Sequence, residues 1–96
     1  MNDDIIAAVI LYNPDILDVL KNVASYAKHV NKVYVFDNSD IINNHQDELS
    51  KAFDNLSYFS FNENKGIGFG VNYIIGQTES SKSKWLLIMD QDSSFG

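Results

Sequence analysis

Four short β-type runs, separated by segments with helical spacing, set the main constraint on how this chain can fold. They are Ile5–Leu11, Val33–Phe36, Tyr58–Phe61 and Trp85–Met89. The first run is continuously apolar rather than alternating, which is typical of a strand buried on both faces of a parallel sheet. The order β-α-β-α-β-α-β predicts a parallel sheet covered by helices and joined by right-handed crossovers. We therefore expect an α/β fold with an open parallel sheet in the strand order 3-2-1-4.

The segments between the runs carry the helix signals. From Asp15 onward, apolar residues recur with the spacing of an amphipathic helix, at Ile16, Leu20, Val23, Ala24, Ala27 and Val30. Asn13 and Pro14 precede this segment as an N-cap residue and a helix-starting proline. His45–Phe53 predicts a short helix, and Ile67–Gln77 predicts a longer one whose glycines lower its helix propensity.

Composition narrows the classes of function. The 96 residues are 45% hydrophobic and 21% charged, which fits one packed domain. The net charge of −6 argues against a nucleic-acid-binding protein, because phosphate neutralisation needs clustered Lys and Arg. For the same reason, a phosphorylated ligand would need a cation to bind near the acidic residues. The absence of cysteine excludes disulfides and Cys-ligated metals.

The predicted topology brings polar groups together at one edge of the sheet. Parallel strands of this kind all end at the same edge, and ligands bind along it where the strand order reverses. The segments that follow the four runs are Tyr12–Asn13, Asp37–Asn38, Asn62–Gly66 and Asp90–Asp92. Small, polar and acidic side chains therefore gather at the carboxyl edge, and we expect the binding site there.

Asp90 and Asp92 form a D-x-D pair directly after the fourth run. In an extended segment, residues two apart project to the same side, so both carboxylates can face one point. Two carboxylates this close repel each other unless a cation lies between or beside them. Mg²⁺ or Mn²⁺, which bridges carboxylates to phosphate oxygens, suits such a pair. The alternative is a solvated turn that caps a following helix together with Ser93 or Ser94.

Two interpretations stay open for Asp37 and Asn38. An acid at the end of the second strand commonly hydrogen-bonds a ribose or base in nucleotide-binding α/β domains. An Asx turn formed by Asp37 or Asn38 explains the same residues without a ligand. His29 and His45 have no partners at metal-ligand spacing, and we expect both of them at the surface.

The stretch NENKGIGFGVN does not match a dinucleotide fingerprint, because Val71 stands where the third glycine is required. We expect a tight turn at Gly66, with Gly68 and Gly70 allowing a helix to approach the sheet or a ligand closely. Lys65 is the basic group among the acids of this edge. It either helps to neutralise a phosphate or is simply solvated.

Taken together, these segments resemble the N-terminal part of the glycosyltransferase family 2 enzymes of the GT-A fold, and most closely the bacterial rhamnosyltransferases. The matching stretches are AAVILYNPD, VYVFDNSD, NENKGIGFGVN and, most specifically, WLLIMDQDS. They follow in the family's order and spacing from Ile5 to Ser94. Each piece alone is a weak signal, whereas four in order are a strong one.

The resemblance implies a role in nucleotide binding for the residues at the carboxyl edge. By position, Tyr12 and Asn13 would line the nucleotide pocket. Asp37 would contact the uracil or thymine base, or its ribose, with Asn38 supporting the loop. The residues implied to border the nucleotide are Asn64, Lys65 and Gly66.

The same resemblance implies the metal and the substrates. Asp90 would lie near the ribose and the metal, and Asp92 would be the direct ligand of Mg²⁺ or Mn²⁺. The donor would be a nucleotide-diphospho-sugar, dTDP-L-rhamnose if the likeness to rhamnosyltransferases holds, and the product a cell-surface polysaccharide. The full-length enzyme would be cytoplasmic, at the inner face of the plasma membrane.

The sequence stops at Gly96, shortly after the D-x-D motif. In inverting relatives the general base is an acid further along the chain, so we expect the base and the half that binds the saccharide acceptor beyond residue 96. Residues 1–96 are therefore expected to be a truncated GT-A nucleotide-sugar-binding portion, inactive as a transferase on its own. The edges of a four-stranded sheet also predict self-association, because unpaired edges pair readily.

Two other classes stay open beside the glycosyltransferase. One is a non-catalytic nucleotide-binding or regulatory α/β module, such as a flavodoxin-like receiver. A receiver places acids at the ends of its first and third strands, where this chain has Leu11-Tyr12 and Phe61-Asn62. The other is a scaffold or inactive remnant without a ligand.

Overall fold

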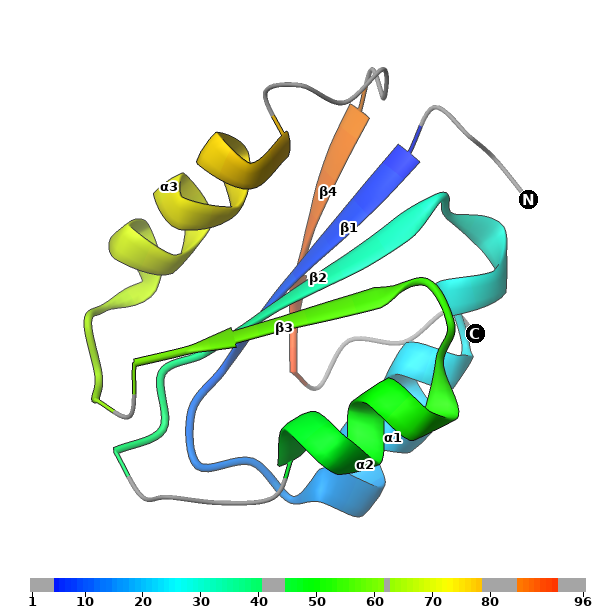
Figure 1. The fold of residues 1–96 in the computed structure, drawn as a ribbon, viewed down its shortest axis with the longest axis horizontal. Helices are drawn as coiled ribbons and strands as arrows, with labels where there is room; N and C mark the ends of the chain where they lie inside the picture. The colour runs from blue at the N-terminus through cyan, green and yellow to red at the C-terminus, as the bar shows by residue number, and fades with distance from the viewer. Residues whose placement is uncertain (1–4, 41–44, 62, 79–84, 92–96) are drawn as a thin grey trace.

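The computed structural model describes residues 5–40, 45–61, 63–78 and 85–91. A four-stranded sheet forms the middle layer, with α1 and α2 on one face and α3 on the other (Figure 1). The elements in chain order are β1 (Ile5–Leu11), α1 (Ile16–Ala24), the 3₁₀ turn η1 (Ala27–His29), β2 (Lys32–Asp37), α2 (His45–Ala52), β3 (Leu56–Ser60), α3 (Ile67–Thr78) and β4 (Trp85–Asp90). No helix among the described residues is long and apolar enough to cross a membrane.

The sheet has the predicted topology. Its strand order is β3-β2-β1-β4, and all three pairings are parallel. Ile10 pairs with Phe36 on one side and with Asp90 on the other, so the carboxyl ends of the three neighbouring strands lie level. Both the α/β class and the strand order 3-2-1-4 are confirmed.

The chain changes direction across the sheet at β1. From β1 it proceeds outward through β2 to β3, with α1 and α2 on one face, and then returns by α3 to place β4 on the other side of β1. The strand order therefore reverses between β1 and β4. In open α/β sheets this switch point is where ligands bind, outside the carboxyl ends of the strands.

Alternate residues of β1 contribute to two cores. On the face of α1 and α2, Ala7 and Val9 pack with Val33 and Val35 of β2. On the face of α3, Ala8 packs with Phe36 and Ile74, and the neighbouring hydrophobic residues are Ile10, Tyr34, Phe59, Tyr73 and Leu86. Burial on both faces explains why the run in β1 is continuous and not alternating.

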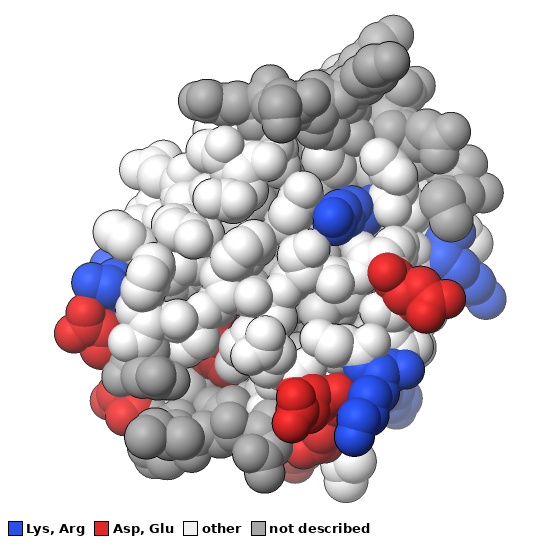
Figure 2. Space-filling view, in the orientation of Figure 1, with Lys and Arg blue, Asp and Glu red and all other residues white. Residues whose placement is uncertain are grey.

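Aromatic rings fill the space between α3 and the β2–β3 side of the sheet. Phe36 lies with its ring centre 5.4 Å from that of Tyr73 and 5.7 Å from that of Phe69. Phe61, just after β3, lies 5.4 Å from Tyr73, and both Phe61 and Phe69 are partly exposed. Figure 2, in the same orientation as Figure 1, shows few charged side chains in the middle of the view, around β3, whereas acidic and basic side chains gather over α2.

The first helix starts later and ends earlier than the sequence predicts. Asp15 is its N-cap, because Oδ1 of Asp15 accepts a hydrogen bond from the N–H of Leu17 at 3.0 Å. Asn13 has a left-handed φ of 41°, so the prediction of Asn13 as the N-cap is wrong. At the other end, the N–H and the hydroxyl of Ser25 both donate to the carbonyl of Asn22, which tightens the last turn and stops the helix before η1.

The glycines around α3 have different roles. Gly66 has a φ of 87°, which confirms the predicted turn. A Cβ at Gly70 would lie 3.0 Å from Cδ1 of Ile10 and 3.0 Å from Cδ1 of Phe36, so this glycine allows α3 to approach the sheet. At Gly68 such a Cβ would have nothing within 4 Å, so this glycine does not serve close approach to the sheet, and its approach to a ligand stays a prediction.

Gly70→Ala tests this close approach. We expect the free energy of unfolding to fall by about 1–2 kcal/mol, because overpacking against a buried ring costs about 1–3 kcal/mol and outweighs the gain in helix propensity. Gly76→Ala is the matched control in the same helix, since a Cβ there meets nothing within 4 Å. Urea denaturation should show this control gaining up to about 1 kcal/mol. Equal gains for both variants would contradict the packing argument.

The edge strand β4 makes the predicted self-association testable. Trp85 is 65% exposed and Ile88 is 57% exposed, and Asp90 is the only charged residue of the strand. Exposed apolar edges with few charges pair with other strands. In sedimentation equilibrium we expect an average mass that rises above that of one chain with concentration, and Trp85→Lys should lower it. A strict monomer at high concentration would refute the expectation.

Candidate functional site

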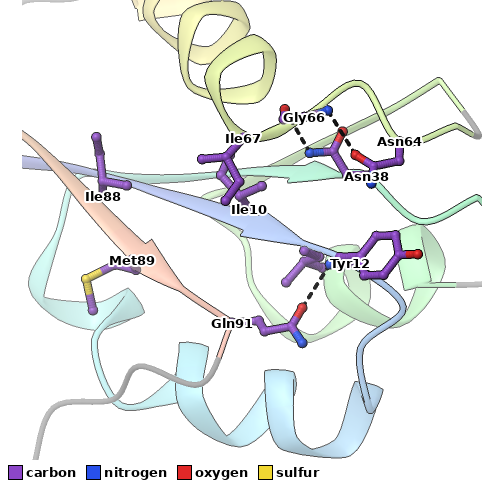
Figure 3. Close-up of a pocket in the computed structure, with 10 residues that line it drawn as sticks. Ile10, Tyr12, Asn38, Asn64, Gly66, Ile67, Ile88, Met89 and Gln91 are labelled. Carbon is purple, nitrogen blue, oxygen red and sulfur yellow. Dashed lines mark hydrogen bonds between the residues drawn. The ribbon is translucent and has the colours of Figure 1, made fainter.

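A pocket of about 580 Å³ opens at the switch point, between the carboxyl ends of β1 and β4 and the start of α3 (Figure 3). This volume falls within the range of about 300–1,000 Å³ that is usual for small-molecule sites. Its polar lining side chains are Tyr12, Asn38, Asn64 and Gln91. They come from the residues that follow β1 and β2, the loop before α3, and the turn after β4, so four separate segments meet here.

The remaining wall of the pocket is apolar. Ile10 of β1 and Ile67 of α3 lie on the α3 side of the sheet, with Ile88 beside them on β4 (Figure 3). Met89 lines the pocket from the opposite face of β4, where it packs against the α1–α2 core. The pocket therefore combines a polar end with an apolar end, as ligand sites commonly do.

Hydrogen bonds connect the ends of neighbouring strands beyond the sheet ladder. The N–H of Tyr12 donates to Oε1 of Gln91 at 2.9 Å, which links β1 to β4. The N–H of Asn13 donates to Oγ of Ser39 at 2.8 Å, and the N–H of Asn38 donates to the carbonyl of Leu11 at 2.7 Å. These two bonds link β1 to β2. The left-handed backbone at Asn13 is thus held by a specific partner.

Asn38 also fixes the loop that begins α3. Its Oδ1 accepts from the N–H of Lys65 at 3.1 Å, and its Nδ2 donates to the carbonyl of Gly66 at 3.1 Å. Within the loop, the N–H of Gly66 donates to Oδ1 of Asn64 at 2.9 Å. The end of β2 thereby sets the position of the helix start that borders the pocket.

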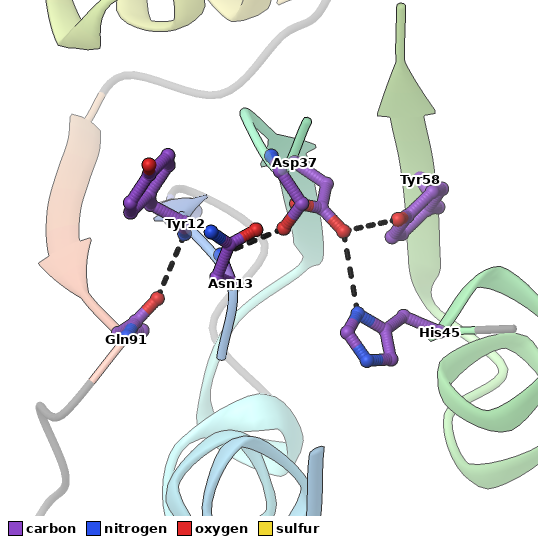
Figure 4. Close-up of polar contacts among 7 residues, drawn as sticks. Tyr12, Asn13, Asp37, His45, Tyr58 and Gln91 are labelled. Carbon is purple, nitrogen blue, oxygen red and sulfur yellow. Dashed lines mark hydrogen bonds and ion pairs between the residues drawn. The ribbon is translucent and has the colours of Figure 1, made fainter. Parts of the chain in front are cut away.

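Asp37 is fully buried, with 0% exposure, and its carboxylate bonds inside the fold (Figure 4). The N–H of Ser39 donates to Oδ1 at 2.8 Å, the two-residue spacing of an Asx turn, so the Asx interpretation is confirmed. The hydroxyl of Tyr58 donates to Oδ2, and Nδ1 of His45 lies 3.4 Å from the same oxygen. Asp37 thus connects β2, β3 and α2, and it is not among the described residues that line the pocket.

The surroundings of Asp37 set its charge state. Burial alone raises the pKa of this carboxyl, but the hydrogen bonds from Ser39, Tyr58 and His45 outweigh burial and leave the pKa below its ordinary value. For Tyr58, burial together with the adjacent carboxylate raises the pKa far above the ordinary value. The carboxylate therefore stays ionised and the phenol stays a donor at neutral pH.

The side chains of His45 and Lys65 both contact neighbouring side chains. The prediction of His45 at the surface is wrong, because its side chain is only 14% exposed and faces Asp37. Nζ of Lys65 lies 2.6 Å from Oε1 of Glu63 and sits over the rings of Phe61 and Phe69, at 5.3 Å and 5.2 Å from their centres. The ammonium of Lys65 thus contacts these two aromatic rings. Lys65 is not among the described residues that line the pocket.

The D-x-D pair falls largely outside the described part. Asp90 ends β4 opposite Ile10, and only its main chain is described. Asp92 lies outside the described residues, and so do Ser93 and Ser94 of the capping alternative. Within the described residues, no three His, Asp or Glu side chains form a group able to hold a metal ion. The metal site remains a prediction from the sequence.

Of the predicted nucleotide-site residues, four line one pocket: Tyr12, Asn38, Asn64 and Gly66. Asn13 lies next to Tyr12 and contributes its main chain to the strand-end bonds. Sequence reasoning missed Gln91, which lines the pocket, and Ser39, which holds Asn13. A polar residue inside the D-x-D pair was the available signal for Gln91.

Comparisons of the chain with protein-family models, with curated proteins and with solved structures found no significant match. The resemblance to glycosyltransferase family 2 therefore depends on the four sequence stretches alone.

The Asp37 network predicts a pH-dependent stability. Tyr58→Phe should lower the free energy of unfolding by about 1.5–3 kcal/mol at pH 7, the usual contribution of a hydrogen bond to a charged group. Because the folded-state pKa of Asp37 is lowered, its contribution is complete above the unfolded-state pKa of about 3.9 and is lost as the pH falls through the folded-state pKa. The curves of wild type and variant should therefore converge in acid.

Urea denaturation between neutral pH and about pH 2 provides the measurement, with the acid limit set well below the ordinary Asp pKa. Tyr34→Phe is the control from the neighbouring strand, because the hydroxyl of Tyr34 makes no hydrogen bond within the described part of the chain. A difference between Tyr58→Phe and wild type that stays constant across this pH range would disprove the role of the ionised carboxylate.

Proposed function

We propose that this chain is the nucleotide-sugar-binding portion of a glycosyltransferase related to family 2, with rhamnosyltransferases as the nearest type. The observation that supports it best is the pocket at the switch point of the parallel sheet, lined by Tyr12, Asn38, Asn64 and Gln91. Donor binding in this pocket would serve the synthesis of a cell-surface polysaccharide.

The polar end of the pocket suits a nucleoside diphosphate. Tyr12 is 49% exposed at the pocket mouth, and its ring offers a flat surface for a base or ribose. The first hydrogen bond at the start of α3 runs from the N–H of Gly70 to the carbonyl of Gly66. The N–H groups of residues 67–69 come before the first hydrogen bond of the helix. Such N–H groups at a helix start bind phosphate oxygens.

Charge supports a requirement for a cation. The chain carries a net charge of −6, and the nearby ammonium of Lys65 already contacts Glu63. A diphosphate at this edge therefore needs positive charge from elsewhere, and we propose Mg²⁺ or Mn²⁺ held by Asp92 and Asp90. Such a metal, when bound, neutralises the charge that develops on a departing diphosphate.

The strand order weighs against a flavodoxin-like receiver. That fold has the order 2-1-3-4-5, in which β1 lies between β2 and β3. Here β2 lies between β1 and β3. The order 3-2-1-4 instead matches the first four strands of the order 3-2-1-4-5-6, which is typical of dinucleotide-binding doubly wound folds.

Calorimetric titration with dTDP and UDP tests the proposal. We expect binding that strengthens at least tenfold when Mg²⁺ or Mn²⁺ is present, because the metal bridges the acids to the phosphates. Asp92→Ala should remove this metal dependence. Asp54→Ala is the control, since it removes an exposed acid from the turn before β3 at the opposite edge of the sheet. Equal nucleotide affinity with and without metal in the wild-type chain would contradict the proposed function.

A further inference from the structure

Three amide side chains line the pocket at the switch point, and each uses its oxygen inside the fold. They are Asn38, Asn64 and Gln91 (Figure 3). In every case the amide oxygen accepts a main-chain N–H, at 3.1 Å for Asn38, 2.9 Å for Asn64 and 2.9 Å for Gln91. The acceptor end of each amide is therefore already engaged before a ligand enters.

These bonds determine which end of each amide is left for a ligand. Only the oxygen of an amide can accept an N–H, so the NH₂ group lies at the other end. Nδ2 of Asn38 is engaged as well, because it donates to the carbonyl of Gly66 at 3.1 Å. Nε2 of Gln91 and Nδ2 of Asn64 make no hydrogen bond within the described part of the chain. The amides of Gln91 and Asn64 thus have donors to offer.

The charge of the pocket narrows the kind of group that these donors suit. None of the described residues that line the pocket carries a charged side chain. Uncharged donors satisfy a neutral carbonyl oxygen, whereas a phosphate in the same place would be buried without a counter-charge. The apolar wall formed by Ile10, Ile67 and Ile88 offers contact to a flat ring. Together these features suit a neutral ring that carries carbonyl groups.

We propose that Gln91 and Asn64 determine the base specificity of the pocket, as hydrogen-bond donors to the carbonyl oxygens of uracil or thymine. This inference rests on the proposed function. It assigns recognition of the base to two amides in the pocket and not to the buried carboxylate of Asp37. The N–H groups of residues 67–69 remain available for the phosphates.

Cytosine provides the comparison for this role. Thymine and uracil have an acceptor oxygen on C4, whereas cytosine has an amino group there, which donates. An amino group that meets Nε2 of Gln91 or Nδ2 of Asn64 sets donor against donor and leaves both without a partner. We therefore expect the wild-type chain to bind UDP about tenfold or more tightly than CDP, since an unsatisfied polar group costs about 1–3 kcal/mol.

Gln91→Glu and Asn64→Asp test the two donors separately. Each carboxylate can still accept the same main-chain N–H, so the internal bond stays, but the NH₂ group is replaced by an acceptor oxygen. This oxygen pairs with the amino group of cytosine and repels the carbonyl of uracil. The measurement is the ratio of the Kd of CDP to that of UDP, by calorimetry at one Mn²⁺ concentration. We expect this ratio to fall about tenfold or more in each variant.

Asn72→Asp is the matched control. It makes the same change from amide to carboxylate on an exposed residue of α3 that is not among the described residues lining the pocket. UDP and CDP carry the same diphosphate, so the effect of an added negative charge on the phosphates cancels in the ratio. The control should keep the wild-type ratio. A merely structural role for Gln91 and Asn64 also predicts an unchanged ratio, because both carboxylates keep the internal bonds.

The outcomes separate the two proposals. A wild-type chain that binds UDP and CDP equally, or variants that both keep the wild-type ratio, would overturn this inference and leave the proposed function standing. A chain that binds neither nucleotide would overturn both. Near-ultraviolet circular dichroism identifies a variant that does not fold. Because Gln91 and Asn64 lie in different segments, the other variant then decides.

Discussion

The burial of β1 on both faces and its pairing on both sides determine where everything else in this molecule lies. Ala7, Ala8 and Val9 are completely buried, and their small side chains let helices pack from above and below. Parallel neighbours on both sides bring the carboxyl ends of β2 and β4 level with that of β1. The pocket follows from this arrangement, because the chain leaves β1 towards β2 and returns beside it as β4.

Beyond the ladder, one main-chain bond joins the N–H of Asn38 to the carbonyl of Leu11, and side chains form further bonds between the strand ends. Amide and hydroxyl groups of Gln91, Asn38 and Ser39 each bond to the backbone of a different segment. Short polar side chains suit this task, because they reach the backbone groups that diverging strands leave unpaired. The main chain at Tyr12 and Asn13 is thereby fixed in a conformation that regular pairing does not impose, including a positive φ at Asn13.

The sequence predicts the parallel sheet well because hydrophobic periodicity is a local signal, and because alternating strands and helices form a parallel sheet with helices packed on it. It also predicts that Tyr12, Asn38, Asn64 and Gly66 gather, since that follows from strand ends alone. The sequence does not predict the hydrogen-bond partners of individual polar groups. The bond between Tyr12 and Gln91 joins residues 79 positions apart, and the burial of His45 depends on how α2 docks. The sequence analysis placed the N-cap at Asn13, whereas the N–H of Asn13 bonds to Ser39, 26 positions away, and Asp15 caps the helix.

Polar side chains at the carboxyl edge form hydrogen bonds within the fold itself. The carboxylate of Asp37 already accepts bonds from Ser39 and Tyr58, and both oxygens are engaged. Withdrawing a buried, ionised group from such partners would cost about 1.5–3 kcal/mol for each bond. The polar side chains that line the pocket are instead those of Tyr12, Asn38, Asn64 and Gln91. Asp37 acts on the pocket through the geometry that it holds between β2, β3 and α2.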